Sequence, residues 1–290
     1  MRRTIISLAV GLLLPLSVAH ADVAGDIKAG LPLQTVLMNA LKEKSSIESA
    51  LREVIAASPE QAYAAITAAL QLSPDQAATI VSIALAREYN LNPPQVVAAA
   101  LQGAPEKAGI IVPTAIVKSP SYYTVPIVQR ALADGVDGSK FLPQAIRTAP
   151  RQGDSILAQA LRSAPQQTEA IMKSVIADQP DKATQYVRVA LDAKAPAADV
   201  LAGAFKGAPR QADQIAAIAK EKGVPTPVIA GAASSAKVEV AGLQQGDSTY
   251  MNSQARQSNI TVSPFATPSA GGGGGGSGRT APAAFSPTAP

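Results

Sequence analysis

Apolar side chains recur along the chain in blocks of about fifteen residues. In the blocks that begin at Pro165 and Pro180, apolar or small residues stand three, six, seven, ten and eleven positions after the proline. Steps of three and four residues mark one face of an α-helix, so each block predicts a helix of about three turns. Thirteen such units, spaced by 14 to 16 residues, begin at Gly30, Lys44, Pro59, Pro74, Asn90, Pro105, Ser121, Gly135, Pro150, Pro165, Pro180, Lys194 and Pro209.

Two positions of the unit are almost invariant within this one chain. The tenth position after the start is alanine in eleven of the thirteen units, with Val54 and Val175 as exceptions. The next position is large and apolar in twelve units and is Lys220 in the last. A small residue beside a large one allows neighbouring helices to approach closely and interlock.

Proline explains why the chain restarts its helices. Its fixed φ suits the first turn of a helix and breaks a helix that is already under way. In Ser58-Pro59-Glu60-Gln61 and Ser73-Pro74-Asp75-Gln76, a serine precedes the proline, and a glutamine stands three residues after that serine. This spacing predicts a capping box at the start of each of these two units.

Helices of three turns are marginal alone, so successive units must pack antiparallel and stack. We therefore expect an all-α fold, an α-solenoid of about thirteen short helices with a two-helix repeat of about 30 residues. A closed helical bundle is the alternative fold. A single right-handed coiled coil would also fit the apolar period, but the recurring prolines argue against it.

The first 21 residues have the pattern of a cleaved secretory signal. Arg2 and Arg3 precede an apolar run, and Ala19-His20-Ala21 follows it. The run is interrupted by Pro15 and is shorter than the roughly 20 residues of a spanning helix. We expect an exported protein, periplasmic or extracellular, with a repeat domain over residues 22–239 and no stable membrane insertion.

Composition narrows the chemistry of the mature chain. The full sequence has no cysteine or tryptophan, and its one histidine, His20, belongs to the predicted signal. The mature chain therefore has no histidine either. The usual imidazole base, the thiolate nucleophile and the nitrogen and sulfur ligands of zinc are therefore absent, and we expect no cofactor and no metal. Without Arg2 and Arg3, 23 basic residues face 21 acidic ones, and no basic run suggests nucleic-acid binding.

The C-terminal region differs in composition from the units. Residues 240–290 are rich in Gly, Ser, Gln, Pro and Thr and include an uninterrupted glycine run at residues 271–276, so we expect a disordered tail. Phe265 and Phe285 each stand beside a Ser-Pro pair within it. They are either part of a solvated tail or anchors for a partner.

The acidic residues give little support for an enzyme. Glu60, Asp75, Glu106 and Asp181 each follow a proline at a unit start, where the helix dipole already favours a negative charge. Paired carboxylates could in principle hydrolyse glycosides, and a carboxylate-dependent hydrolase is retained as the least favoured class.

Two non-catalytic classes remain. The favoured one is an exported scaffold that binds another protein; the alternative is a self-assembling subunit of the cell surface or extracellular matrix. Lys220, Glu221 and Lys222 would form a polar end to the last unit, whereas the first unit is more apolar. Candidate partner-binding residues are Leu33, Leu37, Tyr122, Tyr123, Phe265 and Phe285.

Overall fold

The computed structural model describes residues 23–44, 46–241 and 243. Within them the chain forms α-helices and short 3₁₀ turns, and no strand. The α-helices are α1 (Val23–Lys28), α2 (Leu33–Lys44), α3 (Ile47–Ala57), α4 (Ala62–Leu72), α5 (Ala77–Ala84), α6 (Pro93–Gly103), α7 (Ala108–Lys118), α8 (Thr124–Ala133), α9 (Leu142–Thr148), α10 (Gly153–Ser163), α11 (Thr168–Asp178), α12 (Ala183–Asp192), α13 (Ala197–Gly207), α14 (Ala212–Glu221) and α15 (Thr226–Ala236). The 3₁₀ turns are Pro59–Gln61, Pro74–Gln76, Pro105–Lys107, Ser121–Tyr123, Gly138–Lys140, Pro150–Gln152, Pro165–Gln167, Pro180–Lys182 and Pro209–Gln211.

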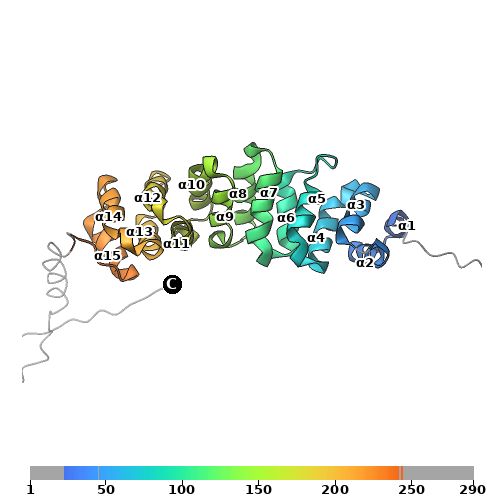
Figure 1. Cartoon of the computed structure of the whole chain (residues 1–290), viewed down its shortest axis with the longest axis horizontal. Coiled ribbons are helices and arrows are strands. Elements are labelled where there is room, and N and C mark those ends of the chain that lie inside the picture. Colours follow the sequence, from blue (N-terminus) through green and yellow to red (C-terminus); the bar gives the residue numbers. More distant parts are fainter. Residues whose placement is uncertain (1–22, 45, 242, 244–290) are drawn as a thin grey trace, which may run out of the picture. The chain divides into compact units, whose positions relative to one another are not determined.

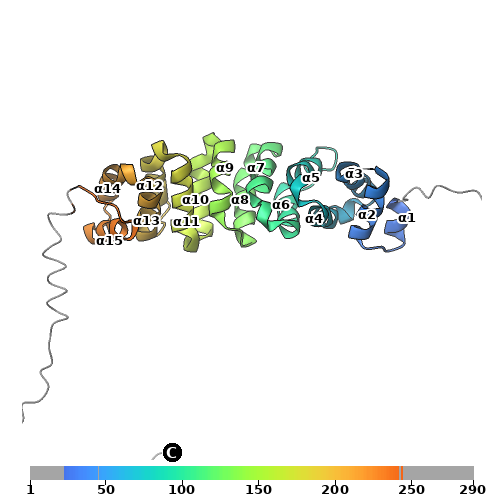
Figure 2. The same cartoon turned by 60° about the horizontal axis from the view of Figure 1, so that its bottom comes forward.

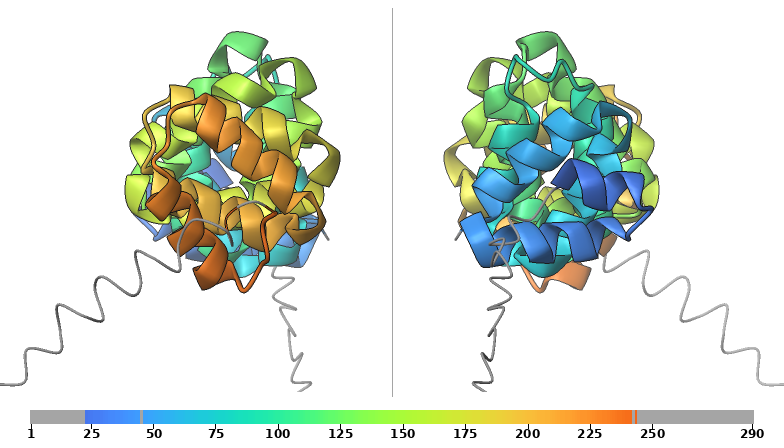
Figure 3. Two further views of the ribbon diagram at one scale, coloured as in Figure 1. Left: turned by 90° about the vertical axis from the view of Figure 1, so that its left-hand side faces the viewer. Right: turned by 90° about the vertical axis from the view of Figure 1, so that its right-hand side faces the viewer.

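The helices stack in two layers. Beyond its neighbours in sequence, each helix contacts the helix two places along the chain, as α4 contacts α6 and α11 contacts α13. The even-numbered helices α2 to α14 form one layer, called the even layer below, and the odd-numbered helices form the odd layer. Figures 1 and 2 show the row from two sides, and Figure 3 shows it from its ends. The predicted α-solenoid is confirmed.

The tenth and eleventh positions of the units, called the inward frame below, face the core between the two layers. The thirteen predicted units are the helices α2 to α14, and the residue at the tenth position is fully buried in every one of them. At the eleventh position nine side chains are buried, Leu41, Leu85 and Leu191 are half-buried, and Lys220 is exposed. The small and large positions therefore form the continuous core between the layers.

Seven junctions between units share one geometry built around proline. At the Ala164-Pro165 junction, Ala164 has φ −136° and ψ 64°, which ends α10. Its N–H donates to the carbonyl of Ala160, the tenth residue of its unit, at 2.9 Å. Pro165 then opens a 3₁₀ turn that leads into α11. The proline thus separates two helices with one non-helical residue.

The predicted capping boxes do not form, and this expectation is corrected. The N–H of Gln61, which a capping hydroxyl would bind, donates to the main-chain oxygen of Ser58 at 3.1 Å. The Ser58 hydroxyl donates instead to the Glu60 carboxylate and lowers the pKa of that carboxyl. Ser73 likewise makes no capping bond with its side chain, because the 3₁₀ turn already satisfies the N–H of Gln76.

A second kind of junction uses a left-handed residue. Gly30, Asn90, Gly135, Lys194 and Gly223 have positive φ, from 47° at Asn90 to 80° at Gly135. After Lys194, the N–H of Ala195 donates to the carbonyl of Ala190 at 3.1 Å, as in a Schellman motif. The acceptor is again the tenth residue of the unit, as it is for the N–H of Val136 after Gly135 and of Val224 after Gly223.

Both ends of the row extend beyond the predicted units. Helix α1 packs on α2 and α3, and α15 packs on α13 and α14; neither was predicted. Val240 and Leu243 are also buried, so the packed part continues to Leu243, past the expected boundary at residue 239. The predicted signal sequence at residues 1–21 lies outside the described residues, as do residues 242 and 244–290 of the tail predicted over residues 240–290.

The expected polar end is also corrected. Because α15 follows α14, Lys220, Glu221 and Lys222 do not terminate the row. Glu221 accepts from Arg188 and Lys222 donates to Asp192, so two of the three side chains bind α12 along the even layer. These charges link neighbouring helices.

In two pairs of helices, glycine on one helix lies against the backbone of the other. A Cβ at Gly103 of α6 would lie 2.6 Å from the carbonyl oxygen of Thr67 in α4. A Cβ at Gly203 of α13 would lie 2.5 Å from the carbonyl oxygen of Glu169 in α11, and Gly207 faces Lys173 in the same way at 2.8 Å. Only glycine allows backbones this close.

Ion pairs between helices of one layer join residues about thirty positions apart. Lys107 pairs with Asp75 at 2.6 Å, and this hydrogen bond lowers the pKa of the Asp75 carboxyl. This spacing is close to the length of the two-helix repeat, because each pair joins corresponding parts of consecutive repeats. The other described pairs of this spacing are Arg52 with Glu88 of the α5–α6 connection, Arg147 with Asp178, Lys206 with Glu169, Arg188 with Glu221 and Lys222 with Asp192.

Candidate functional site

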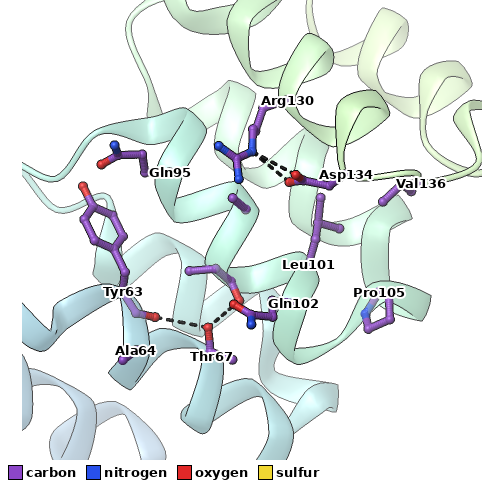
Figure 4. Close-up of a pocket in the computed structure, with 12 residues that line it drawn as sticks. Tyr63, Ala64, Thr67, Gln95, Leu101, Gln102, Pro105, Arg130, Asp134 and Val136 are labelled. Atoms are coloured by element: carbon purple, nitrogen blue, oxygen red, sulfur yellow. Dashed lines mark hydrogen bonds and ion pairs between the residues drawn. The ribbon is translucent and has the colours of Figure 1, made fainter.

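A groove of about 800 Å³ lies across α4, α6 and α8 on the even layer (Figure 4). We call it the α4–α8 groove. Its lining residues are Tyr63, Ala64, Thr67, Gln95, Ala98, Ala99, Leu101, Gln102, Pro105, Arg130, Asp134 and Val136. Three helices from successive repeats therefore contribute to one hollow.

The floor of the groove is made of small side chains from α4 and α6. Ala64, Thr67 and Ala98 leave room above the helices because none extends far from the backbone. Thr67 also joins the two helices: its hydroxyl lies 2.9 Å from the carbonyl oxygen of Ala99 and 3.2 Å from that of Tyr63. The glycine contact at Gly103 holds α6 against α4 beneath this floor.

The rim of the groove carries longer polar and aromatic side chains. The Tyr63 hydroxyl accepts from the N–H of Asn92 at 3.1 Å, which fixes the ring beside the start of α6. Arg130 donates from Nε to both carboxylate oxygens of Asp134, at 3.0 and 2.9 Å. Figure 4 shows Gln95 and Gln102 at separate places on the rim.

A second hollow, of about 720 Å³, lies where the α5–α6 connection meets the end of α7 and the start of α8. Tyr122 is 71% exposed, and its ring centroid lies 4.5 Å from that of Tyr123, which is half-buried. Val117 beside them is 65% exposed. The sequence-predicted tyrosines therefore do come together on a surface hollow.

The other predicted partner-binding residues are not exposed on the described surface. Leu37 is fully buried in the core between the layers, so the expectation that it contacts a partner is corrected. It stands at the seventh position of its unit, where the repeat itself places core residues. Leu33 is half-buried and packs against the same core. Phe265 and Phe285 lie outside the described residues.

Sequence reasoning missed the α4–α8 groove altogether. Five of its twelve lining residues stand five, eight or twelve positions after a unit start, on the outward face of α4 and α6. Ala64 and Gln95 hold the fifth position, Thr67 and Ala98 the eighth, and Gln102 the twelfth. The sequence signal for the groove is weak, because the eighth position is also small in α10, α13 and α14, at Ala158, Ala202 and Ala217.

The described residues offer few other sites. They contain no cluster of three or more histidine, cysteine or acidic side chains that could hold a metal ion. None of the helices among them is long and apolar enough to cross a membrane. No family model, curated protein or solved structure matches the chain.

Proposed function

We propose that this protein is a non-catalytic, exported helical-repeat scaffold that binds another protein through the α4–α8 groove. The observation that carries the proposal is the groove itself, an open hollow shared by three consecutive helices of the even layer. Stacked helical repeats provide extended surfaces of this kind for protein recognition.

Charge on the even layer supports the choice of this site. Between α12 and α14 the outward surface is crossed by the Arg188–Glu221 and Lys222–Asp192 pairs. Within the groove, the one described ion pair is Arg130 with Asp134, and both residues belong to the end of α8. The surface over α4 and α6 is therefore left to small and uncharged side chains, which a partner can cover at little desolvation cost.

Sequence supports the other parts of the proposal. The N-terminal pattern of basic, apolar and small residues is typical of a secretory signal, which places the partner in the periplasm or outside the cell. The mature chain has no histidine or cysteine, so mechanisms that need an imidazole base or a thiolate nucleophile have no residues to use.

A peptide library displayed on phage and selected on the mature chain tests the proposal. Ala98→Arg fills the groove, and we expect it to abolish binding of the enriched peptides. Ala217→Arg is the matched control, because Ala217 holds the same eighth position in α14, outside the groove. Enrichment of no peptide, or equal binding to both variants, would refute the groove as the binding site.

A further inference from the structure

Two glutamines on the rim of the α4–α8 groove, Gln95 and Gln102, differ from three glutamines that join neighbouring elements of a layer. Gln152 donates to the carbonyl of Ser121, Gln167 accepts from the N–H of Gly138, and Gln185 donates to Asp154. Each of these amides links helices within a layer. Gln95 and Gln102 are exposed, and neither side-chain amide has a hydrogen-bond partner among the residues that the structure describes.

The spacing of these two glutamines matches one particular backbone conformation. Seven residues along α6 correspond to about 10.5 Å and nearly two full turns, so both side chains leave the same face. In a polyproline II helix, residues three apart also face the same side, and they are separated by about 9.3 Å. Glutamine side chains can bridge this small difference. In a β-strand, residues three apart face opposite sides.

Chemical complementarity points the same way. A polyproline II segment makes no internal hydrogen bonds, so its carbonyl oxygens are free to accept from the amide NH₂ groups of Gln95 and Gln102. An α-helical partner has already used these groups along its length. The ring of Tyr63 on the same rim suits proline, which packs on aromatic surfaces.

Charge adds a further requirement on the partner. Arg130 binds Asp134 through Nε, and its two terminal Nη groups have no partner among the described residues. A carboxylate on the bound segment would complement them, since a guanidinium group pairs well with carboxylates.

We infer that the α4–α8 groove binds an extended, proline-rich segment in the polyproline II conformation, with an acidic side chain near Arg130. The carbonyls of residues three apart accept from Gln95 and Gln102. This inference rests on the proposed function and deepens it, because it names the class of partner.

Disulfide tethering tests the inference without knowledge of the natural partner. The chain has no cysteine, so Ala64→Cys gives a single thiol in the groove of the full mature protein. Three cysteine-terminated decapeptides serve as probes: one proline-rich with glutamate, one proline-rich with lysine, and one alanine-rich and helical with glutamate. Intact mass spectrometry measures the captured fraction at a fixed concentration of reductant.

We expect the acidic proline-rich probe to be captured about threefold to tenfold more than the helical probe. Gln95→Ala and Gln102→Ala should each lower its capture about twofold to tenfold, the usual effect of one lost hydrogen bond. Arg130→Gln should remove the preference for glutamate over lysine. All three residues are exposed, so the fold should be unaffected, which circular dichroism checks.

Ala217→Cys in α14 is the matched control and should show no preference among the probes. Equal or better capture of the helical probe, or the same preference at Ala217→Cys, would overturn the inference. If peptides selected from the phage library bind the groove while the proline-rich probe is not preferred, the proposed function stands and the inference fails. If neither binds, both fail.

Discussion

The α4–α6–α8 and α10–α12–α14 parts of the even layer share one inward frame and differ on their outward faces. At the eighth position of the unit, α6 has Ala98 where α12 has Arg188. At the twelfth, α6 has Gln102 where α12 has Asp192. The first part forms a groove of about 800 Å³, and the second is crossed by ion pairs to Glu221 and Lys222.

This difference separates two roles within one repeat. The buried tenth and eleventh positions hold the layers together in both parts, and they tolerate little variation because core packing is dense. The outward positions vary more between units, for example from Ala98 in α6 to Arg188 in α12. One region of the row can therefore specialise in binding while another is linked by charges.

The largest effects should come from the shared frame. Leu101 in α6 and Leu161 in α10 both hold the eleventh position, and both are buried. Leu101→Ala and Leu161→Ala should each lower the free energy of unfolding by about 2–5 kcal/mol. Urea unfolding followed by circular dichroism measures the loss, and Leu31→Ala, at a residue that is 38% exposed, is the control.

A single transition is expected for both leucine variants, because each stacked repeat is stabilised by its neighbours. Two separate transitions would show that the groove part and the charged part fold independently. That result would mean that the row consists of two separate domains and not of one continuous core.

The frame was predictable from the sequence because its signal is local and repeated. Apolar spacing gave all thirteen helices from α2 to α14, and proline gave most of their starts. Leu37 shows where the reasoning was inconsistent: the seventh position already indicated burial, yet the residue was also proposed to contact a partner. Tyr122 stands outside the buried positions, and it is exposed.

The groove was not predictable in the same way, because it depends on which outward positions become neighbours. Ala64 and Ala98 lie 34 positions apart in the sequence, and only the stacking of α4 on α6 brings them together. The packing role of Gly103 could not be predicted from the sequence either, because a glycine near a helix end ordinarily suggests a cap. Its role in close packing becomes visible only with the carbonyl of Thr67 beside it.

Gly103 offers a sharper test of how the two parts differ. It holds the thirteenth position of its unit, where the unit of α12 has Ala193 directly after the helix. Gly103→Ala introduces the residue of the charged part, but its Cβ would lie 2.6 Å from the Thr67 oxygen and 2.8 Å from Cβ of Leu70. We expect a loss of about 1–3 kcal/mol in the free energy of unfolding, because the helices must move apart.

Gly231→Ala in α15 is the control for Gly103→Ala, because a Cβ there meets nothing within 4 Å. It should stabilise the protein by up to about 1 kcal/mol through helix propensity alone. If Gly103→Ala were equally stabilising, α4 and α6 would not be held as closely as the structure shows, and the floor of the groove would have another cause.

The smallest effect should come from the ion pairs of the charged part. The side chains of Arg188 and Glu221 are 48% and 58% exposed, so water and salt screen their attraction. A double-mutant cycle with Arg188→Gln and Glu221→Gln should give a coupling energy of about 0.2–1 kcal/mol at low salt and less at high salt. Thermal unfolding at the two salt concentrations measures it. A larger coupling that persisted in high salt would mean that α12 and α14 depend on their charges for stacking. The outward positions would then contribute to the frame, and the separation of roles between the two parts would not hold.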